Sequence, residues 1–191
     1  MTPTFEDVLA AVPRIAPYLH RTPILTSATL NAELGAEVFF KCENLQKIGA
    51  FKARGATNAV MCLSQEACDR GVITHSSGNH GAAVAFAAAK RGARCVVVMQ
   101  EGASELKAAA IRGYGADVQL CSKGERESST QEIMEREGLS FIHPFEDPFV
   151  IAGQGTCGLE IITQVEELGV NLDGLLICCS GGGLTAGLAI V

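Results

Sequence analysis

The sequence predicts a two-domain α/β protein in which helices cover both faces of parallel β-sheets, and two observations support this prediction. Between residues 72 and 143, short runs rich in Val, Ile and Cys alternate with helical segments, as in successive βαβ units. Most of these runs are apolar throughout, as expected for strands buried between two layers of helices. The 191 residues can bury a substantial core and suffice for one large domain or two small ones.

The first 71 residues predict short helices and extended segments. Thr4 and Asp7 have the spacing of a capping box, so we expect a short helix that Pro13 then disrupts. Arg21 to Leu25 should be extended, because the residue before a proline avoids the helical region. The other elements expected here are a strand over 37–42 and a helix over 52–63.

A regular alternation of strands and helices begins after Gly71. The expected strands are 72–75, 94–99, 117–121 and 139–143, and the helices between them are 82–91, 104–112 and 128–137. A helix over 151–168, a buried strand over 174–179, a glycine loop and an apolar helix reaching Val191 should follow. This order predicts a small α/β domain, residues 72–146, inserted into a larger domain made of residues 1–71 and 147–191.

The composition argues against several classes of partner. The net charge is −6, and the 15 Lys and Arg residues form no basic stripe, so we expect no nucleic-acid binding. The longest apolar stretch, residues 82–89, is too short to span a bilayer, and the acidic N-terminus lacks the apolar core of a secretory signal. The sequence therefore predicts a soluble, cytoplasmic protein without a membrane partner.

The cysteines and histidines predict neither disulfides nor a metal site. No two cysteines have C-x-x-C spacing, and several lie in apolar runs, which indicates free thiols in a reducing compartment. The four histidines are scattered, so we expect no zinc site. The cysteines are Cys42, Cys62, Cys68, Cys95, Cys121, Cys157, Cys178 and Cys179.

Lys52 is a candidate nucleophile because of the residues around it. It stands at the start of an apolar helix, among small residues and beside the aromatic Phe51. Partial burial disfavours an ammonium and makes the amine able to form a Schiff base with a carbonyl group. From this segment alone, a solvated charge at a helix start is the commoner interpretation.

Two loops between a predicted strand and a predicted helix are candidate anion sites. In the run from Ser180 to Leu184, consecutive glycines would let backbone N–H groups converge on a phosphate, although a tight turn with positive φ is an alternative. The run from Ser76 to Gly81 could hold a carboxylate or a second phosphate, with the Asn79 amide near a ring oxygen. Capping of the next helix by Ser77 or Asn79 would equally explain those residues.

A third glycine pattern, Gly153 to Gly158, matches the dinucleotide fingerprint G-x-G-x-x-G. That fingerprint requires a strand before the first glycine, whereas the residues after Asp147-Pro148 favour the start of a helix. Close packing between helices explains these glycines better than a nicotinamide site.

Together, the segments resemble the serine racemase and threonine/serine dehydratase branch of the fold type II pyridoxal-phosphate enzymes. The resemblance runs from near residue 15 to the end of the chain. The matching segments, in order, are Lys41–Asn44, Gly49–Ala56, Thr74–Gly81, Ala152–Thr156 and Gly181–Leu184. It implies a large domain split around a small one, with the cofactor in the cleft between them.

The resemblance also implies roles for individual residues. Lys52 would form the Schiff base with pyridoxal 5'-phosphate, beside Phe51, and Asn79 would hydrogen-bond the ring hydroxyl. The phosphate cradle would be Ser180, Gly181, Gly182, Gly183 and Leu184. The substrate carboxylate would be held by Ser76, Ser77, Gly78, Asn79 and His80. From the residues alone, His80 could equally close a helix turn, and a structural role is favoured for His143.

The chemistry that the resemblance implies starts when Lys52, freed by the substrate amine, removes the Cα proton. Loss of the β-hydroxyl and hydrolysis would then yield a 2-oxo acid and ammonia from serine, threonine or 3-hydroxyaspartate. A serine or aspartate racemase is the rival interpretation, for which Ser77 resembles the acid on the opposite face. The segment Pro144–Pro148 is closer to the dehydratases, so elimination is favoured.

Some features depart from the family pattern. Ser180 stands where a fourth glycine is common, and its N–H remains available. The family's later residues, which include the partner of the pyridine nitrogen and in many members a divalent-cation site, have no match before Val191. We therefore expect C-terminal truncation, and an inactive chain or a partner-binding fragment is the hypothesis of another class. An intact protein would bind a small amino acid and form a homodimer or higher homo-oligomer.

Overall fold

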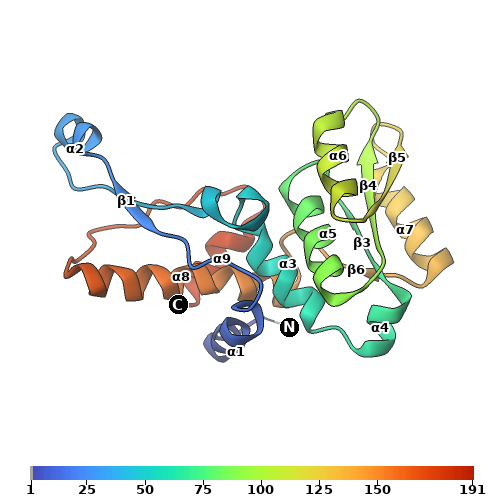
Figure 1. Ribbon diagram of the computed structural model, residues 1–191, viewed down its shortest axis with the longest axis horizontal. Coiled ribbons are helices and arrows are strands. Elements are labelled where there is room, and N and C mark those ends of the chain that lie inside the picture. Colours follow the sequence, from blue (N-terminus) through green and yellow to red (C-terminus); the bar gives the residue numbers. More distant parts are fainter. Residues whose placement is uncertain (1) are drawn as a thin grey trace.

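The computed structural model describes residues 2–191, and its elements fall into two groups (Figure 1). A parallel sheet with helices on both faces forms the right half of Figure 1, and a long helix and a short antiparallel pair of strands extend to the left. This architecture confirms the predicted α/β fold class with a parallel sheet. None of the helices within residues 2–191 is long and apolar enough to cross a membrane.

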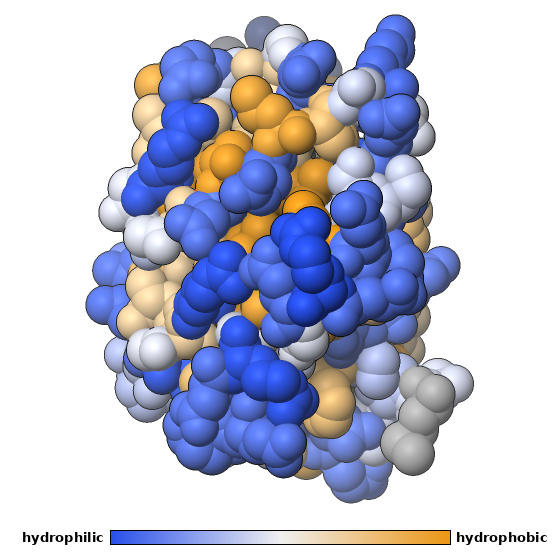
Figure 2. All heavy atoms as spheres, turned by 90° about the vertical axis from the view of Figure 1, so that its right-hand side faces the viewer, coloured by the Kyte–Doolittle hydropathy of each residue, from blue (hydrophilic) through white to orange (hydrophobic). Residues whose placement is uncertain are grey.

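The sheet contains four parallel strands in the order β5-β4-β3-β6. The strands are β3 (Val72–His75), β4 (Cys95–Gln100), β5 (Asp117–Cys121) and β6 (Ser140–Phe141). One face packs against α5 (Asn79–Arg91) and α6 (Glu105–Gly113), and the other packs against α7 (Arg126–Glu137). Burial on both faces explains why β3 and β4 are apolar almost throughout. Polar side chains cover most of this end of the molecule (Figure 2).

Helix α3 (Lys52–Met61) packs against both α5 and α8 (Pro148–Leu168), so it connects the sheet and its helices to the remaining elements. The first part of the chain forms α1 (Phe5–Ile15), the antiparallel pair β1 (Ile24–Thr26) and β2 (Phe39–Lys41), and α2 (Ala28–Leu34) between them. The others are the short helices η1 (Glu43–Leu45) and η2 (Lys47–Gly49), then α4 (Gln65–Arg70), α8 (Pro148–Leu168) and α9 (Gly183–Ala189).

The G-x-G-x-x-G run lies inside α8, so the preference for helix packing over a dinucleotide site is confirmed. A Cβ atom on Gly153 would lie 2.7 Å from the carbonyl oxygen of Arg54 in α3. One on Gly155 would lie 2.7 Å from Cγ2 of Val8 in α1. These glycines let the backbone of α8 approach the backbone of α3 and the Val8 side chain of α1 more closely than a Cβ would allow.

Two predicted features are wrong. Residues 174–179 form no strand, and Leu176 is fully exposed, because a strand needs a hydrogen-bonded neighbour and none of the described strands pairs with this segment. Pro13 does not disrupt α1, which continues to Ile15. A proline removes only one N–H, and its loss close to the end of a helix leaves the following turn intact.

All eight cysteines are free, as expected, but Cys178 and Cys179 are exposed. No group of His, Cys, Asp or Glu side chains within residues 2–191 is arranged to hold a metal ion.

A buried ion network joins α3 to its neighbours. The Arg54 side chain is 1% exposed, and its guanidinium donates to both carboxylate oxygens of Glu43 and of Glu160 at 2.7–2.8 Å. Lys41 Nζ lies 2.6 Å from Glu160 Oε2. Burial raises the pKa of Glu160, but the hydrogen bonds and positive charges of Arg54 and Lys41 more than offset it, so the pKa is lowered. The network is ionised and internally paired.

Replacement of Arg54 by Met should lower the free energy of unfolding by about 3–5 kcal/mol, because Glu43 and Glu160 lose their shared partner. Urea denaturation monitored by circular dichroism measures this change. Arg112→Met is the matched control, since Arg112 pairs with the exposed Glu105 at 2.7 Å, and this change should cost less than about 1 kcal/mol. Equal stability of the Arg54 variant and the unchanged protein would contradict a stabilising role for the network.

Candidate active site

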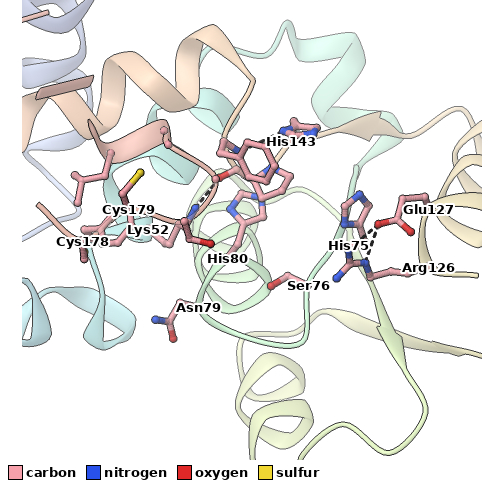
Figure 3. A pocket seen from close by; sticks show the side chains of 18 residues that line it. Lys52, His75, Ser76, Asn79, His80, Arg126, Glu127, His143, Cys178 and Cys179 are labelled. Carbon is pink, nitrogen blue, oxygen red and sulfur yellow. Dashed lines mark hydrogen bonds and ion pairs between the residues drawn. The ribbon is translucent and has the colours of Figure 1, made fainter. Parts of the chain in front are cut away.

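A cavity of about 570 Å³ lies where the ends of β3 and β6 meet the start of α3 and the glycine loop before α9 (Figure 3). Most of the site residues predicted from the sequence line it: Phe51, Lys52, Ser76, Asn79, His80, Ser180, Gly181, Gly182, Gly183 and Leu184. Two of them, Ser77 and Gly78, are not among its lining residues. The fold therefore brings three segments of the chain, far apart in sequence, into one cavity.

Lys52 enters this cavity from the first residue of α3. Its Nζ donates a hydrogen bond to the carbonyl oxygen of Pro144 at 2.7 Å and lies 5.4 Å from the centroid of the Phe51 ring. Partial burial lowers the pKa of the Lys52 amine, because the charged form loses hydration there. The lowered pKa increases the neutral, nucleophilic fraction of the amine, as expected from the sequence.

The glycine loop leads directly into α9. Gly182 is the N-cap of α9 and has a φ of 83°, so the turn does need the left-handed region there. Gly181 and Gly183 lie against Phe145, whose ring and backbone occupy the space that a Cβ atom would need. The first N–H groups of a helix have no intrahelical partner. No side chain caps α9, so these groups remain available to an anion.

The loop after β3 has a similar arrangement. Gly78 is the N-cap of α5, and no side chain caps this helix, so the alternative of capping by Ser77 or Asn79 is wrong. The Ser76 hydroxyl instead accepts a hydrogen bond from the N–H of Gly78 at 3.1 Å. Asn79, the first residue of α5, is exposed and lines the cavity. The amides at the start of α5 are therefore not consumed by a cap.

His80 lines the cavity, yet its side chain is almost completely buried. Its Nε2 lies 3.1 Å from the carbonyl oxygen of Ile142. Burial lowers the pKa of His80 to about 3, and the hydrogen bond to Ile142 offsets this only in part. The imidazole is therefore neutral, and Nε2 carries its proton because the facing carbonyl can only accept. The predicted contact of His80 with the substrate remains a prediction.

Several lining residues were not predicted as part of the site: His75, Arg126, Glu127, His143, Phe145, Cys178 and Cys179. For all but Cys178 and Cys179, which directly follow none of the described strands, the signal is position, because the carboxyl ends of parallel strands meet at one edge of the sheet. Arg126 begins α7, just after β5, and its charge helps burial to lower the pKa of His75. His143 has the expected structural role, since its Nδ1 accepts from the N–H groups of Phe145 and Glu146.

A family model described as "Pyridoxal-phosphate dependent enzyme" matches residues 15–191. The chain belongs to this family. A serine racemase of Dictyostelium discoideum is 48% identical over 191 residues, with 99% of this chain and 58% of the relative covered. A beta-hydroxyaspartate dehydratase of Paracoccus denitrificans is 46% identical over 190 residues, with 98% of this chain and 59% of the relative covered. The chain thus spans less than two thirds of the length of these relatives.

The fold comparison agrees. The crystal structure of a T.th. threonine deaminase superposes with a TM-score of 0.91 at 45% identity, over 98% of this chain and 60% of that one. The crystal structure of the Dictyostelium discoideum serine racemase gives a TM-score of 0.92 at 47% identity, over 100% of this chain and 61% of that one. These similarities confirm the fold type II architecture and the resemblance noted from the sequence.

The expectation of pyridoxal phosphate as cofactor is confirmed at the level of the family. The residues present fit such a group. The cavity offers an amine of lowered pKa at Lys52 and an aromatic ring at Phe51. It also contains the uncapped start of α9, which follows glycines that leave no room for a Cβ atom. The first two suit an aldehyde-bearing ring, and the last suits a phosphate.

Protonation of His80 should destabilise the fold as the pH falls. An unfolded His80 binds its proton near pH 6.5, whereas the folded protein does so only near pH 3, so stability is fully present above 6.5 and is lost below it. Urea denaturation should show a loss of about 2 kcal/mol from this residue at about pH 5.

His80→Gln serves as the comparison for this pH dependence, because glutamine does not titrate and other groups contribute equally to both proteins. Its stability should fall less over the same range. Equal losses in the two proteins would show that His80 does not carry the pH dependence.

Proposed function

We propose that this protein catalyses the pyridoxal-phosphate-dependent deamination of a β-hydroxy amino acid such as L-threonine or L-serine to a 2-oxo acid. One observation supports this most strongly: the Lys52 amine, with its lowered pKa, shares a cavity with the glycine loop before α9. Relatives named as a dehydratase and an ammonia-lyase, at 46% and 45% identity, support the same reaction type.

The chain's own residues can be assigned to the steps. Pyridoxal phosphate, when bound, supplies the electron sink that stabilises negative charge at the substrate Cα. Lys52 in its neutral form takes the Cα proton, and the carbonyl oxygen of Pro144, which accepts its hydrogen bond at 2.7 Å, holds the resulting ammonium. The ammonium can return this proton to the leaving β-hydroxyl, so that water departs. Hydrolysis of the remaining enamine releases ammonia and the 2-oxo acid.

Elimination is proposed in preference to racemisation because of the position of Ser77. Racemisation needs an acid on the face of the substrate opposite Lys52, and the resemblance implies Ser77 for this role. Ser77 is partly buried and is not among the residues lining the cavity. The relatives named as serine racemases, at 43–48% identity, keep racemisation as the alternative reaction.

A dicarboxylic substrate such as 3-hydroxyaspartate is a second candidate, which Arg126 favours. Arg126 lines the same cavity as Lys52, and its guanidinium contacts the neighbouring Glu127 at 2.6 Å. Figure 3 shows this pair across the cavity from Lys52, beside His75. A second substrate carboxylate could replace Glu127 as the partner of Arg126. Relatives named for hydroxyaspartate, at 46% and 45% identity, support this substrate class.

The cytoplasmic location and the homodimeric or higher assembly are proposals, as is the small amino acid as the binding partner. An inactive chain or a binding fragment remains the hypothesis of another class.

Borohydride reduction in the presence of pyridoxal phosphate should attach the cofactor to Lys52, because its amine has the lowered pKa and faces the cavity. Peptide mass spectrometry locates the adduct. Lys52→Arg should abolish the adduct and the release of 2-oxo acid, whereas Lys47→Arg, five residues away in η2, should change neither. Labelling at another lysine would refute the assignment of Lys52.

Arg126→Leu should lower kcat/KM for 3-hydroxyaspartate by about 10–100-fold through the loss of a charge-assisted hydrogen bond. The value for serine should change less than about threefold, since serine has no second carboxylate. Arg136→Leu, on the same helix but solvent-exposed, is the matched control for the removal of one charge. Equal losses for both substrates would remove the support for a dicarboxylic substrate.

A further inference from the structure

The turn from Ile142 to Phe145 connects the parallel sheet to the two parts of the candidate cofactor site. The carbonyl oxygen of Pro144 accepts the hydrogen bond from Lys52 Nζ at 2.7 Å. Phe145 packs against the glycine loop, where a Cβ on Gly183 would lie 3.1 Å from its Cβ. The position of this turn therefore determines where the Lys52 amine is held and how the glycine loop packs.

The turn is itself anchored at one carbonyl group. The carbonyl oxygen of Ile142 accepts hydrogen bonds from Thr74 Oγ1 at 2.8 Å and from His80 Nε2 at 3.1 Å. The N–H of Ile142 continues the sheet by donating to Ile73 at 2.9 Å. Beyond this point, the contacts of His143 with the next N–H groups close the turn.

The surroundings of His80 fix its tautomer. The side chain is 4% exposed, and its Nδ1 is buried without a hydrogen-bond partner among the described residues. The nearby groups that can carry positive charge are Lys52, His143 and His75, and each disfavours an imidazolium. A neutral ring with its proton on Nε2 is a hydrogen-bond donor to Ile142, and it cannot release that contact without leaving its own buried N–H without a partner.

We propose that His80 is a positioning residue, which fixes the Ile142–Phe145 turn through its Nε2–H and thereby holds the Lys52 amine in the cavity. The imidazole acts on the turn and not on the substrate, which distinguishes this role from the carboxylate contact expected from the sequence. The proposal rests on the proposed function of Lys52, because positioning matters only if Lys52 reacts.

The variants His80→Gln and His80→Asn distinguish the role of Nε2 from that of Nδ1. A glutamine amide can place a donor near the position of Nε2, whereas the shorter asparagine reaches only the position of Nδ1. The pKa of Lys52 is measured on the chain without cofactor by competitive acetylation over a range of pH, with peptide mass spectrometry and Lys107 as internal reference. Far-UV circular dichroism checks that each variant is folded.

In His80→Asn the released turn should let water reach Lys52, so its pKa should rise by about one pH unit. In His80→Gln the pKa of Lys52 should remain within about 0.3 units of that of the unchanged protein. An unshifted pKa in His80→Asn would overturn the proposal. A shift in His80→Gln but not in His80→Asn would also overturn it, because Nδ1 would then carry the role.

Thr74→Val decides the question if His80→Asn does not fold. It removes the other donor to the Ile142 carbonyl with little change in shape and leaves the imidazole in place. A rise in the pKa of Lys52 supports the turn as the shared element, and no change overturns it. Acetylation needs no cofactor, so the two hypotheses can fail separately. If the variant leaves the pKa of Lys52 unshifted and the unchanged protein forms a borohydride adduct on Lys52, only this inference is refuted. If the pKa of Lys52 shifts in the variant but the unchanged protein forms no adduct there, only the proposed function is refuted.

Discussion

The buried guanidinium of Arg54 is the interaction on which the arrangement of the site depends. A charge with 1% exposure is tolerated only when it is paired. The two carboxylates that pair with Arg54 belong to Glu43 in η1 and Glu160 in α8. Arg54 lies two residues after Lys52 in α3, so the network that satisfies Arg54 also fixes the start of the helix that carries Lys52. The close approach of Gly153 in α8 to the backbone of α3 also helps to fix the position of α3. Charge pairing and backbone packing thus place the amine before any ligand contributes.

The cavity lies between the start of α3 and a polar edge of the parallel sheet. Ser76 and Arg126 follow strands of this sheet and line the cavity, and the turn after β6 provides the carbonyl oxygen that contacts Lys52. Burial acts on Lys52 and His80 in the same sense, because it lowers the pKa of each and favours their neutral forms. An amine of lowered pKa in the same cavity as a neutral imidazole suits proton transfer from a carbon acid. It also limits the positive charge that has to be buried in one place.

Relatives of this chain are named as racemases, dehydratases and deaminases, although they share its fold. In the proposed reaction, pyridoxal phosphate stabilises negative charge at the substrate Cα, a step that racemisation and elimination share. The outcome must then depend on the residues that surround the substrate and differ between members. In this chain, the position of Ser77 outside the cavity lining and the presence of Arg126 within it are the features that bear on that choice. Fold and cofactor alone do not decide it.

Much of the fold and part of the site follow from local sequence. The four parallel strands and the helices between them were predictable, because periodicity and capping signals act over a few residues. The association of Lys52 with two glycine-containing loops was implied only by the resemblance to a known family, because these segments are far apart in the sequence. Other features needed the tertiary structure. Residues 174–179 have the composition of a strand, but a strand also needs a neighbour, which local composition does not reveal. The burial of His80 depends on its contact with Ile142, the residue after β6, and the entry of Arg126 into the cavity depends on the common edge of the sheet. The sequence by itself determined which groups can react, and only the tertiary structure decided which are neutral, which are buried and which meet, because desolvation and pairing are set by residues distant in the chain.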